Sequence, residues 1–292
     1  MKVLKLTLAC LFASFVAWIP FAAAAKEHPI AAAKPQNGSL FLLTHEGIVL
    51  AVNLDATKGS VVARFDCKLV GFPSDLAVGM IGSQEALFVA SSWSTSVGMV
   101  QGRVQAFTTD GRLLQTWTLA HVIAGLAFDP EKQLLYITTG DTPEVYSITV
   151  QSDASPRDVG EITGASKLGA IAVDGSRQQL YVADVDRGSV FSMDLGTSQV
   201  GPAGRVGTPQ ALLLDPGRTE LLVADSSRGQ ILAIKLNSQG FQSVPITPPK
   251  AFRSPTGLAW FGSSQLLVAD DDAGTVTLLD AAGHAQLKIP LE

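Results

Sequence analysis

Three aspartates end similar apolar runs and are the first side chains in this sequence that could act chemically as a group: Asp184, Asp225 and Asp270. Each one follows a Val-Ala pair and precedes a polar turn that closes on glycine. Oxygen ligands converging from several strands are what a hard divalent cation requires. An Asp that opens a hairpin turn, however, usually accepts hydrogen bonds from the backbone of that turn. We therefore predict that these aspartates build turns, and we predict neither a metal site nor a cofactor.

The other nucleophiles and bases show no catalytic arrangement. The four histidines, His28, His45, His121 and His284, have no spacing that would place two of them on one metal ion. Ser, His and Asp are all present, but no GxSxG elbow brings them together. We expect Cys67, in the run FDCKLV, to be a buried and unreactive thiol. We favour a protein that is not an enzyme, with His121 as the histidine placed to face a ligand.

These residues lie within a repeat. The stretch QLYVADVDRGSVFSMD joins a β-rich run ending in Ala-Asp, a polar turn and a second β-rich run. Related stretches occur along the whole chain, beginning at Ser39, Ala86, Leu134, Leu221 and Leu266. Their aligned apolar positions recur at steps of 41 to 48 residues, which is the length of one four-stranded propeller blade. Apolar residues alternate or form short β-branched clusters without a helical stripe, which excludes a helical solenoid.

Each repeat predicts four strands. A short apolar strand of small residues comes first and suits the innermost position, as in DLAVG from Asp75. The Ala-Asp strand, the turn and a third strand follow, and then a more polar outer strand such as LLQTWTL from Leu113. Six copies predict an all-β fold, a six-bladed β-propeller of four-stranded antiparallel blades, over residues 26–292. Residues 30–34 are the expected inner strand of blade one. The ring could close at a blade boundary, or residues near Pro290 could pair onto blade one.

The N-terminal segment predicts export. Lys2 and Lys5 precede an apolar run from Leu6 to Ala25 that ends in small residues, as in a cleaved signal peptide over residues 1–25. The run is also long enough to remain as an uncleaved anchor. Cleavage changes the net charge from −5 to −7, because the segment holds two lysines and no acid. We expect a periplasmic or secreted monomer that binds no nucleic acid and has no membrane contact beyond this segment.

Two pairs of motifs carry a resemblance to a known group of propellers. Pro255-Thr-Gly-Leu-Ala-Trp is followed by Leu266-Leu-Val-Ala-Asp, and Ala170-Ile-Ala-Val-Asp is followed by Leu180-Tyr-Val-Ala-Asp. In these motifs the chain resembles NHL-type repeats and the related SMP-30/gluconolactonase-like six-bladed propellers. The resemblance implies a divalent metal at the mouth of the central channel. The positions that match the metal ligands hold no carboxylate: Ser74, Ala124, Gly169, Gln210 and Thr256. Asp75 lies one residue from such a position, and on a regular strand that offset reverses the direction of a side chain.

Blade two contains a longer connection between its second and third strands. The step from Val89 to Val104 is fifteen residues, whereas the equivalent step is eight in four other blades. The additional residues fall in SWSTSVGMVQGR, which carries Trp93 and Met99 on the face where ligands enter propellers of this type. An exposed Trp and Met would suit a partner or ligand contact. The loop could equally fold over the neighbouring blade and bury Trp93.

We therefore predict an exported, non-catalytic propeller that binds an unknown protein or small-molecule ligand at the channel mouth. The residues expected to contact that ligand or partner are Trp93, Met99, Asp75, His121, Gln210 and Thr256. The alternative is a lactone hydrolase of the SMP-30 type, with a rearranged site that uses Asp75, His121 or Gln210. A third possibility is a propeller subunit of a redox or envelope complex.

Overall fold

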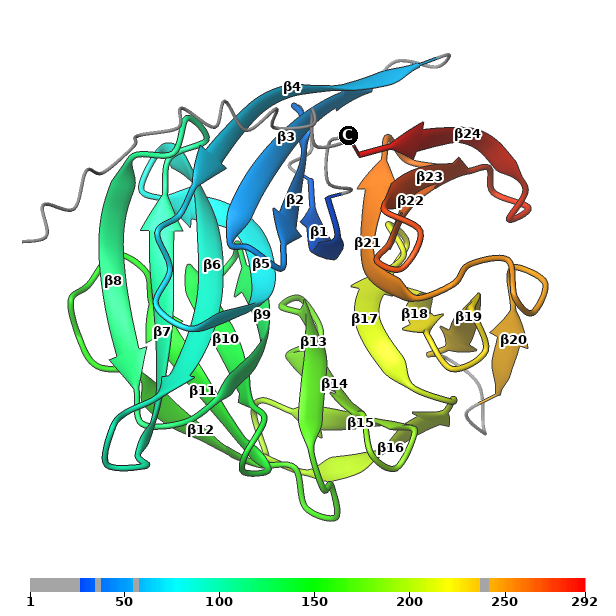
Figure 1. Cartoon of the computed structure of the whole chain (residues 1–292). Helices are drawn as coiled ribbons and strands as arrows, with labels where there is room; N and C mark the ends of the chain where they lie inside the picture. The colour runs from blue at the N-terminus through cyan, green and yellow to red at the C-terminus, as the bar shows by residue number, and fades with distance from the viewer. Residues whose placement is uncertain (1–26, 35–37, 55–57, 237–241, 292) are drawn as a thin grey trace, which may run out of the picture.

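The computed structural model describes residues 27–34, 38–54, 58–236 and 242–291, and within these residues every regular element is a β-strand. The strands form six four-stranded antiparallel sheets, each built from four consecutive strands, arranged as blades around a central axis (Figure 1). This confirms the predicted six-bladed β-propeller. No helix in these residues could cross a membrane. The proposed signal peptide, residues 1–25, lies outside the described residues.

The strands occupy four positions in each blade. The inner strands are β1 (Pro29–Ala33), β5 (Phe72–Ile81), β9 (Ile123–Asp129), β13 (Leu168–Asp174), β17 (Pro209–Leu214) and β21 (Pro255–Phe261). The second strands are β2 (Leu40–Thr44), β6 (Gln84–Ser94), β10 (Leu134–Thr139), β14 (Gln179–Asp184), β18 (Glu220–Asp225) and β22 (Gln265–Asp270). The third strands are β3 (Ile48–Leu54), β7 (Val100–Phe107), β11 (Glu144–Thr149), β15 (Ser189–Asp194), β19 (Gln230–Lys235) and β23 (Thr275–Leu279). The outer strands are β4 (Gly59–Asp66), β8 (Leu113–Leu119), β12 (Arg157–Glu161), β16 (Val200–Arg205), β20 (Ser243–Pro245) and β24 (Ala285–Pro290).

The core consists of apolar clusters that each join two neighbouring blades. Between blades two and three, for example, the fully buried Phe88 stacks on Phe128 with ring centroids 5.8 Å apart. Gly79 on the inner strand of blade two makes this approach possible, because a Cβ there would lie 2.5 Å from the Phe128 ring. Small residues on the inner strands therefore permit the close packing that the sequence pattern predicted.

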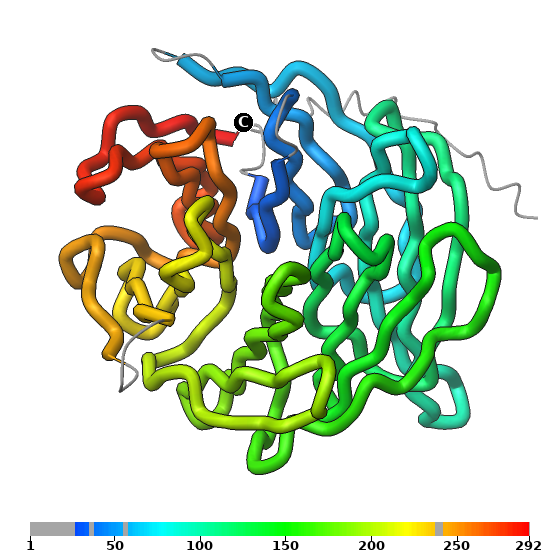
Figure 2. The backbone as a smooth tube through the Cα atoms, turned by 180° about the vertical axis from the view of Figure 1, so that it is seen from behind, coloured from blue at the N-terminus to red at the C-terminus, as the bar shows by residue number. Residues whose placement is uncertain are grey.

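The ring closes at a blade boundary, with no strand exchanged between its ends. Leu40 and Leu42 of blade one pack with Leu267 and Leu278 of blade six in one buried cluster. The Glu27 N–H donates to the Leu291 carbonyl at 3.1 Å, and Figures 1 and 2 both place the end of β24 beside blade one. Of the two closures left open by the sequence, the described residues have the one without exchange. The seam is therefore held by side-chain packing and individual hydrogen bonds rather than by a shared sheet.

The strand-ending aspartates are buried and hold the loops that lead into the inner strands. Asp225 accepts hydrogen bonds from the Gly207 and Thr208 N–H groups at 2.9 and 3.0 Å, and its carboxylate pairs with Arg228 at 3.3 Å. Burial alone would raise the pKa of Asp225, but these N–H donors hold it below the ordinary value. Two further aspartates bond equivalent loops: Asp184 to the Ser166 N–H, and Asp270 to the Arg253 and Ser254 N–H groups. The prediction that all three aspartates bond their own turns is confirmed for Asp184 and Asp225, which accept the Arg187 and Arg228 N–H groups. The bonds of Asp270 go instead to the loop that precedes the inner strand.

Candidate functional site

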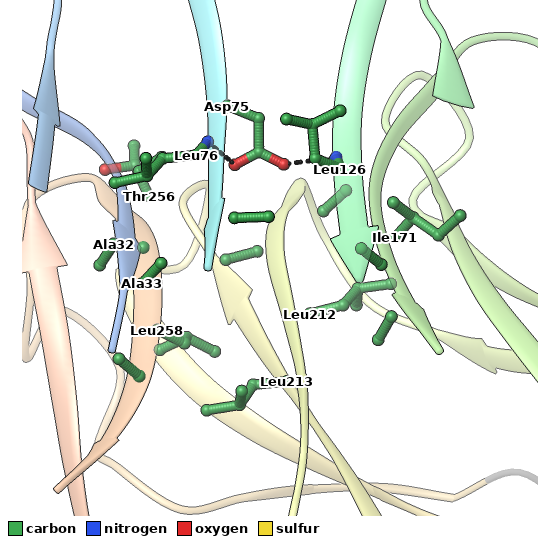
Figure 3. A pocket seen from close by; sticks show the side chains of 18 of the residues that line it. Ala32, Ala33, Asp75, Leu76, Leu126, Ile171, Leu212, Leu213, Thr256 and Leu258 are labelled. Carbon is green, nitrogen blue, oxygen red and sulfur yellow. Dashed lines mark hydrogen bonds between the residues drawn. The ribbon is translucent and has the colours of Figure 1, made fainter. Parts of the chain in front are cut away.

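The inner strands surround a central channel with a cavity of about 960 Å³. Its walls are mostly small or aliphatic, because each inner strand turns residues such as Ala33, Leu213 and Leu258 toward it (Figure 3). We call the end at which the inner strands begin the channel mouth; it is lined by Ser74, Gln210 and Thr256 among others. A cavity that combines apolar side chains with a few converging polar groups is the usual form of a small-molecule site.

Asp75 is the acidic side chain that the inner strands place in this channel. A bulge in β5 lies between Pro73, which pairs with Ser91, and Asp75, which pairs with Ala90. The bulge inserts Ser74 as an unpaired residue and breaks the regular alternation of side chains. The offset argument from a regular strand is therefore wrong for Asp75, whose carboxylate reaches the channel (Figure 3).

Two backbone N–H groups hold the Asp75 carboxylate in place. The Leu76 N–H donates to Oδ1 at 2.8 Å, and the Leu126 N–H, on the inner strand of blade three, donates to Oδ2 at 2.7 Å. Figure 3 shows the carboxylate bridging the two blades in this way. Each oxygen can accept a further hydrogen bond, because an ionised carboxylate has about four acceptor positions. The Asp75 side chain is therefore fixed in position and can still accept hydrogen bonds from a ligand.

Burial among apolar side chains raises the pKa of Asp75 to about 7, although its two N–H partners act in the opposite direction. The residue keeps a partly accessible side toward the channel, so water there moderates the cost of its charge. Within the described residues no salt bridge involves Asp75. A carboxylate whose pKa lies near neutrality can bind as an anion or as a neutral hydrogen-bond donor.

Four of the other five blades place very small residues where blade two has Asp75. The equivalent residue is the first one after the bulge that pairs with the second strand of the same blade. In these four blades it is Ala31, Gly125, Ala211 and Gly257. These positions leave room at the centre of the ring and provide no charge. The carboxylate is thus a specific feature of one blade, added to an otherwise small and apolar ring.

The other predicted channel residues lie at the mouth. Gln210 is exposed, and Thr256 Oγ1 donates to the Pro29 carbonyl at 2.7 Å, across the seam between blades six and one. Ser74 Oγ is buried and has no hydrogen-bond partner among the described residues. His45 Nε2 lies 3.0 Å from Asp271 Oδ2 at the same end. The mouth is therefore polar, in contrast to the channel walls.

His121 lies outside the cavity, in a polar cluster on blade three. Its Nδ1 lies 3.3 Å from Asp141 Oδ2, and its Nε2 lies 3.6 Å from Glu144 Oε2. The Tyr146 hydroxyl donates to Glu144 at 3.0 Å. Of the three residues considered for a rearranged lactone-hydrolase site, the structure brings Asp75 and Gln210 to one channel and places His121 elsewhere.

The predicted loop of blade two is largely sheet. β6 continues through Ser94 and β7 begins at Val100, so the additional residues lengthen both strands and leave only a short turn between them. We call this the blade-two hairpin. Trp93 is half-buried, with the guanidinium of Arg103, on the facing strand of the same hairpin, 4.8 Å from its ring centroid. Met99 is 57% exposed, and neither residue lines the channel.

Metal-binding and nucleophilic groups are scarce in the part of the chain that is described. There, no group of three or more His, Cys, Asp or Glu residues is placed to hold a metal ion. Cys67 is buried, as the sequence predicted, and burial, with a smaller effect of Asp66, raises its thiol pKa to about 12. Such a thiol is protonated at neutral pH and is a poor nucleophile.

Two features of the site were not found from the sequence. Phe72 is 82% exposed at the start of β5, next to the blade-two hairpin through its pairing with Ser92. Trp260 lines the channel near its other end, where its indole N–H donates to the Leu214 carbonyl at 2.8 Å. Trp260 could have been predicted as a channel residue, because it lies on an expected inner strand. The exposure of Phe72 could not, because nothing in the run GFPSD distinguishes an exposed Phe from a buried one.

Comparison with known proteins supports the fold. No protein-family model and no curated protein sequence matches this chain. A chain in the crystal structure of a nidogen/laminin complex aligns with a TM-score of 0.65 and 13% identity, over 84% of this chain and 90% of that one. The structure of streptogramin B lyase aligns with a TM-score of 0.63 and 12% identity, over 92% of this chain and 85% of that one. Identities this low show the shared architecture alone.

Proposed function

We propose that this protein is a binding propeller that takes a small, largely apolar molecule into its central channel. The observation that carries the proposal is the cavity of about 960 Å³, whose lining side chains are mostly small or aliphatic and whose one inner-strand acid, Asp75, is fixed by two backbone N–H groups. Apolar walls supply affinity through the area they remove from water, and a few fixed polar groups orient the ligand.

The rest of the chain suits a binding role rather than chemistry. In the described residues the histidine with the most polar partners, His121, lies outside the channel, and the thiol of Cys67 is buried. The repeat resembles NHL-type and SMP-30-like propellers, and the apolar segment at residues 1–25 favours export. We therefore propose that binding takes place in the periplasm or outside the cell.

A titration with 1-adamantanol followed by protein NMR tests the channel proposal. This probe is a compact apolar body with one hydroxyl group, so it needs no particular charge in the site. Chemical-shift changes are expected at channel residues such as Ala33, Leu213 and Leu258. Replacing Ala33 with Phe should weaken binding by about tenfold, since the larger ring occupies part of the channel, whereas Leu113→Phe, on the outer strand β8, should leave it unchanged. Shifts confined to the outer surface, or none at all, would overturn the proposal.

The blade-two hairpin is a second candidate contact surface, for a protein partner. Val97 is 78% exposed and Met99 57%, and Phe72 lies at the start of the adjacent strand β5. Exposed apolar side chains gathered on one part of a surface are typical of protein-binding sites. This surface lies outside the channel lining, so the two contacts can be tested separately.

A further inference from the structure

We propose that the molecule bound in the channel carries a protonated nitrogen that pairs with Asp75, attached to an apolar body. This inference rests on the proposed function and specifies its ligand. Three observations lead to it: the position of the acid, the charges around it, and the shape of the ring in which it lies.

The carboxylate is positioned before any ligand arrives. Its two bonds, from the Leu76 and Leu126 N–H groups, come from two different blades and fix its orientation within the channel. These bonds leave further acceptor positions on both oxygens, and an ammonium or similar cation is the donor that uses them best. Orientation by the backbone also means that binding does not have to immobilise a flexible side chain.

Among the described residues, the surroundings of Asp75 provide apolar area but no compensating positive charge beside it. The strands packed against β5 are β1, β2, β6 and β9. Of these, β1 and β2 have no ionisable residue, β6 has Glu85 opposite Met80, and β9 has Asp129 as its last residue. The other ionisable residues that line the channel are His45 and Asp271 at the mouth and Lys34 beyond the end of β1. A cationic ligand would therefore supply the charge that burial makes costly for the carboxylate alone.

The equivalent positions in four other blades are occupied without an acid. Ala31, Gly125, Ala211 and Gly257 occupy them without any carboxylate. Close to Asp75, Ser74 Oγ is buried and has no partner among the described residues. An acid that these four blades do without, in the space left by their small residues, points to a ligand group that it recognises. The complementary group for an ionised carboxylate is a cation.

The proposal makes affinity depend on pH. A protonated amine pairs with the ionised form of Asp75, and burial raises the pKa of this carboxyl to about 7. Binding of a cation should therefore strengthen as the pH rises through 7, and it should weaken at pH 5, where Asp75 is protonated. A neutral ligand of the same shape should show little such dependence.

The test compares two probes of the same shape, 1-aminoadamantane, which stays protonated from pH 5 to 8, and 1-adamantanol. Dissociation constants are measured by NMR titration of the purified protein and of its Asp75→Asn and Asp75→Ala variants. The alanine variant carries the residue that blades one and five have at this position, Ala31 and Ala211, so it is a control for folding. At pH 8 we expect the amine to bind the unaltered protein about tenfold more tightly than the alcohol. At pH 5 we expect the dissociation constants of the two probes to agree within about twofold.

Both variants should bind the two probes within about twofold of each other at pH 8. Equal binding of amine and alcohol to the unaltered protein would overturn the cation inference and leave the channel proposal intact. A preference for the amine that persists in both variants would also overturn it, because the cation would then be recognised elsewhere. Failure of both probes to bind in the channel would overturn the proposed function itself.

Discussion

The replacement of Asp75 by Asn should make the folded protein more stable at pH 8 but not at pH 4. Burial raises the pKa of this carboxyl from its ordinary value of 3.8 to about 7. Well below pH 3.8 the side chain is protonated in both the folded and the unfolded chain. Between pH 4 and 7 the unfolded chain loses the proton while the folded chain retains it, so stability falls as the pH rises. Above 7 the loss is complete and constant.

The magnitude follows from the two pKa values. Each tenfold change in proton affinity is worth about 1.4 kcal/mol, so the difference corresponds to about 4 kcal/mol at most. Because Asp75 remains partly accessible to water in the channel, we expect about 2 to 3 kcal/mol. Asn keeps one acceptor oxygen for the Leu76 and Leu126 N–H groups, and the lost bond costs about 1 kcal/mol. The variant should thus gain about 1 to 2 kcal/mol at pH 8 and lose about 1 kcal/mol at pH 4.

Urea denaturation at pH 4, 5.5 and 8 measures this difference directly. Asp66→Asn is the matched control, because Asp66 is exposed and accepts the Lys68 N–H at 2.7 Å, so its removal should give no pH-dependent gain. A difference between Asp75→Asn and the unaltered protein that does not change with pH would refute the reasoning. So would a variant that loses more stability at pH 8 than at pH 4.

Two further predictions concern residues outside the channel. Asp225→Ala should cost about 3 kcal/mol at pH 7, since it removes a fully buried carboxylate and leaves the half-buried Gly207 and Thr208 N–H groups without an acceptor. The contribution of Asp225 is present above the ordinary Asp pKa and is lost as the pH falls through its lowered folded value. Urea denaturation checks this, and a cost equal to that of Asp272→Ala, at an exposed turn position, would contradict it. On the blade-two hairpin, Met99→Ala should change stability by less than about 0.5 kcal/mol but weaken retention of any protein partner by about tenfold. Affinity capture beside Leu113→Ala, an exposed apolar control on β8, tests this, and equal retention by both variants would remove the hairpin from the proposal.

The architecture could be predicted because it repeats. The same features occur several times along the chain: the 41- to 48-residue period, the apolar inner strands and the Ala-Asp strand ends. An error in assigning one strand is therefore corrected by the equivalent strands of the other blades. The inner strand of blade one was expected at residues 30–34 and is found at Pro29–Ala33. Ring closure could not be predicted, because the contacts at the seam join the two ends of the chain and follow no repeat.

Single-residue geometry was harder to predict than the repeat. In a regular strand the Asp75 side chain would point away from the channel. A bulge at Ser74 turns it toward the channel instead. A bulge requires no particular sequence, so this one could not be predicted. The additional residues of blade two were predicted as a loop and instead lengthen β6 and β7. Polar and Gly-containing runs such as SWSTSVGMVQGR can pair as strands when a hairpin partner is adjacent, and propensity alone does not show this.

A crystal structure of the protein with 1-aminoadamantane at pH 8 is the most direct test of the account. The account predicts the adamantyl body between the inner strands, with its nitrogen at hydrogen-bond distance from the Asp75 carboxylate and the Leu126 N–H bond retained. Density for the probe outside the channel, or inside it with the nitrogen turned away from Asp75, would contradict the account.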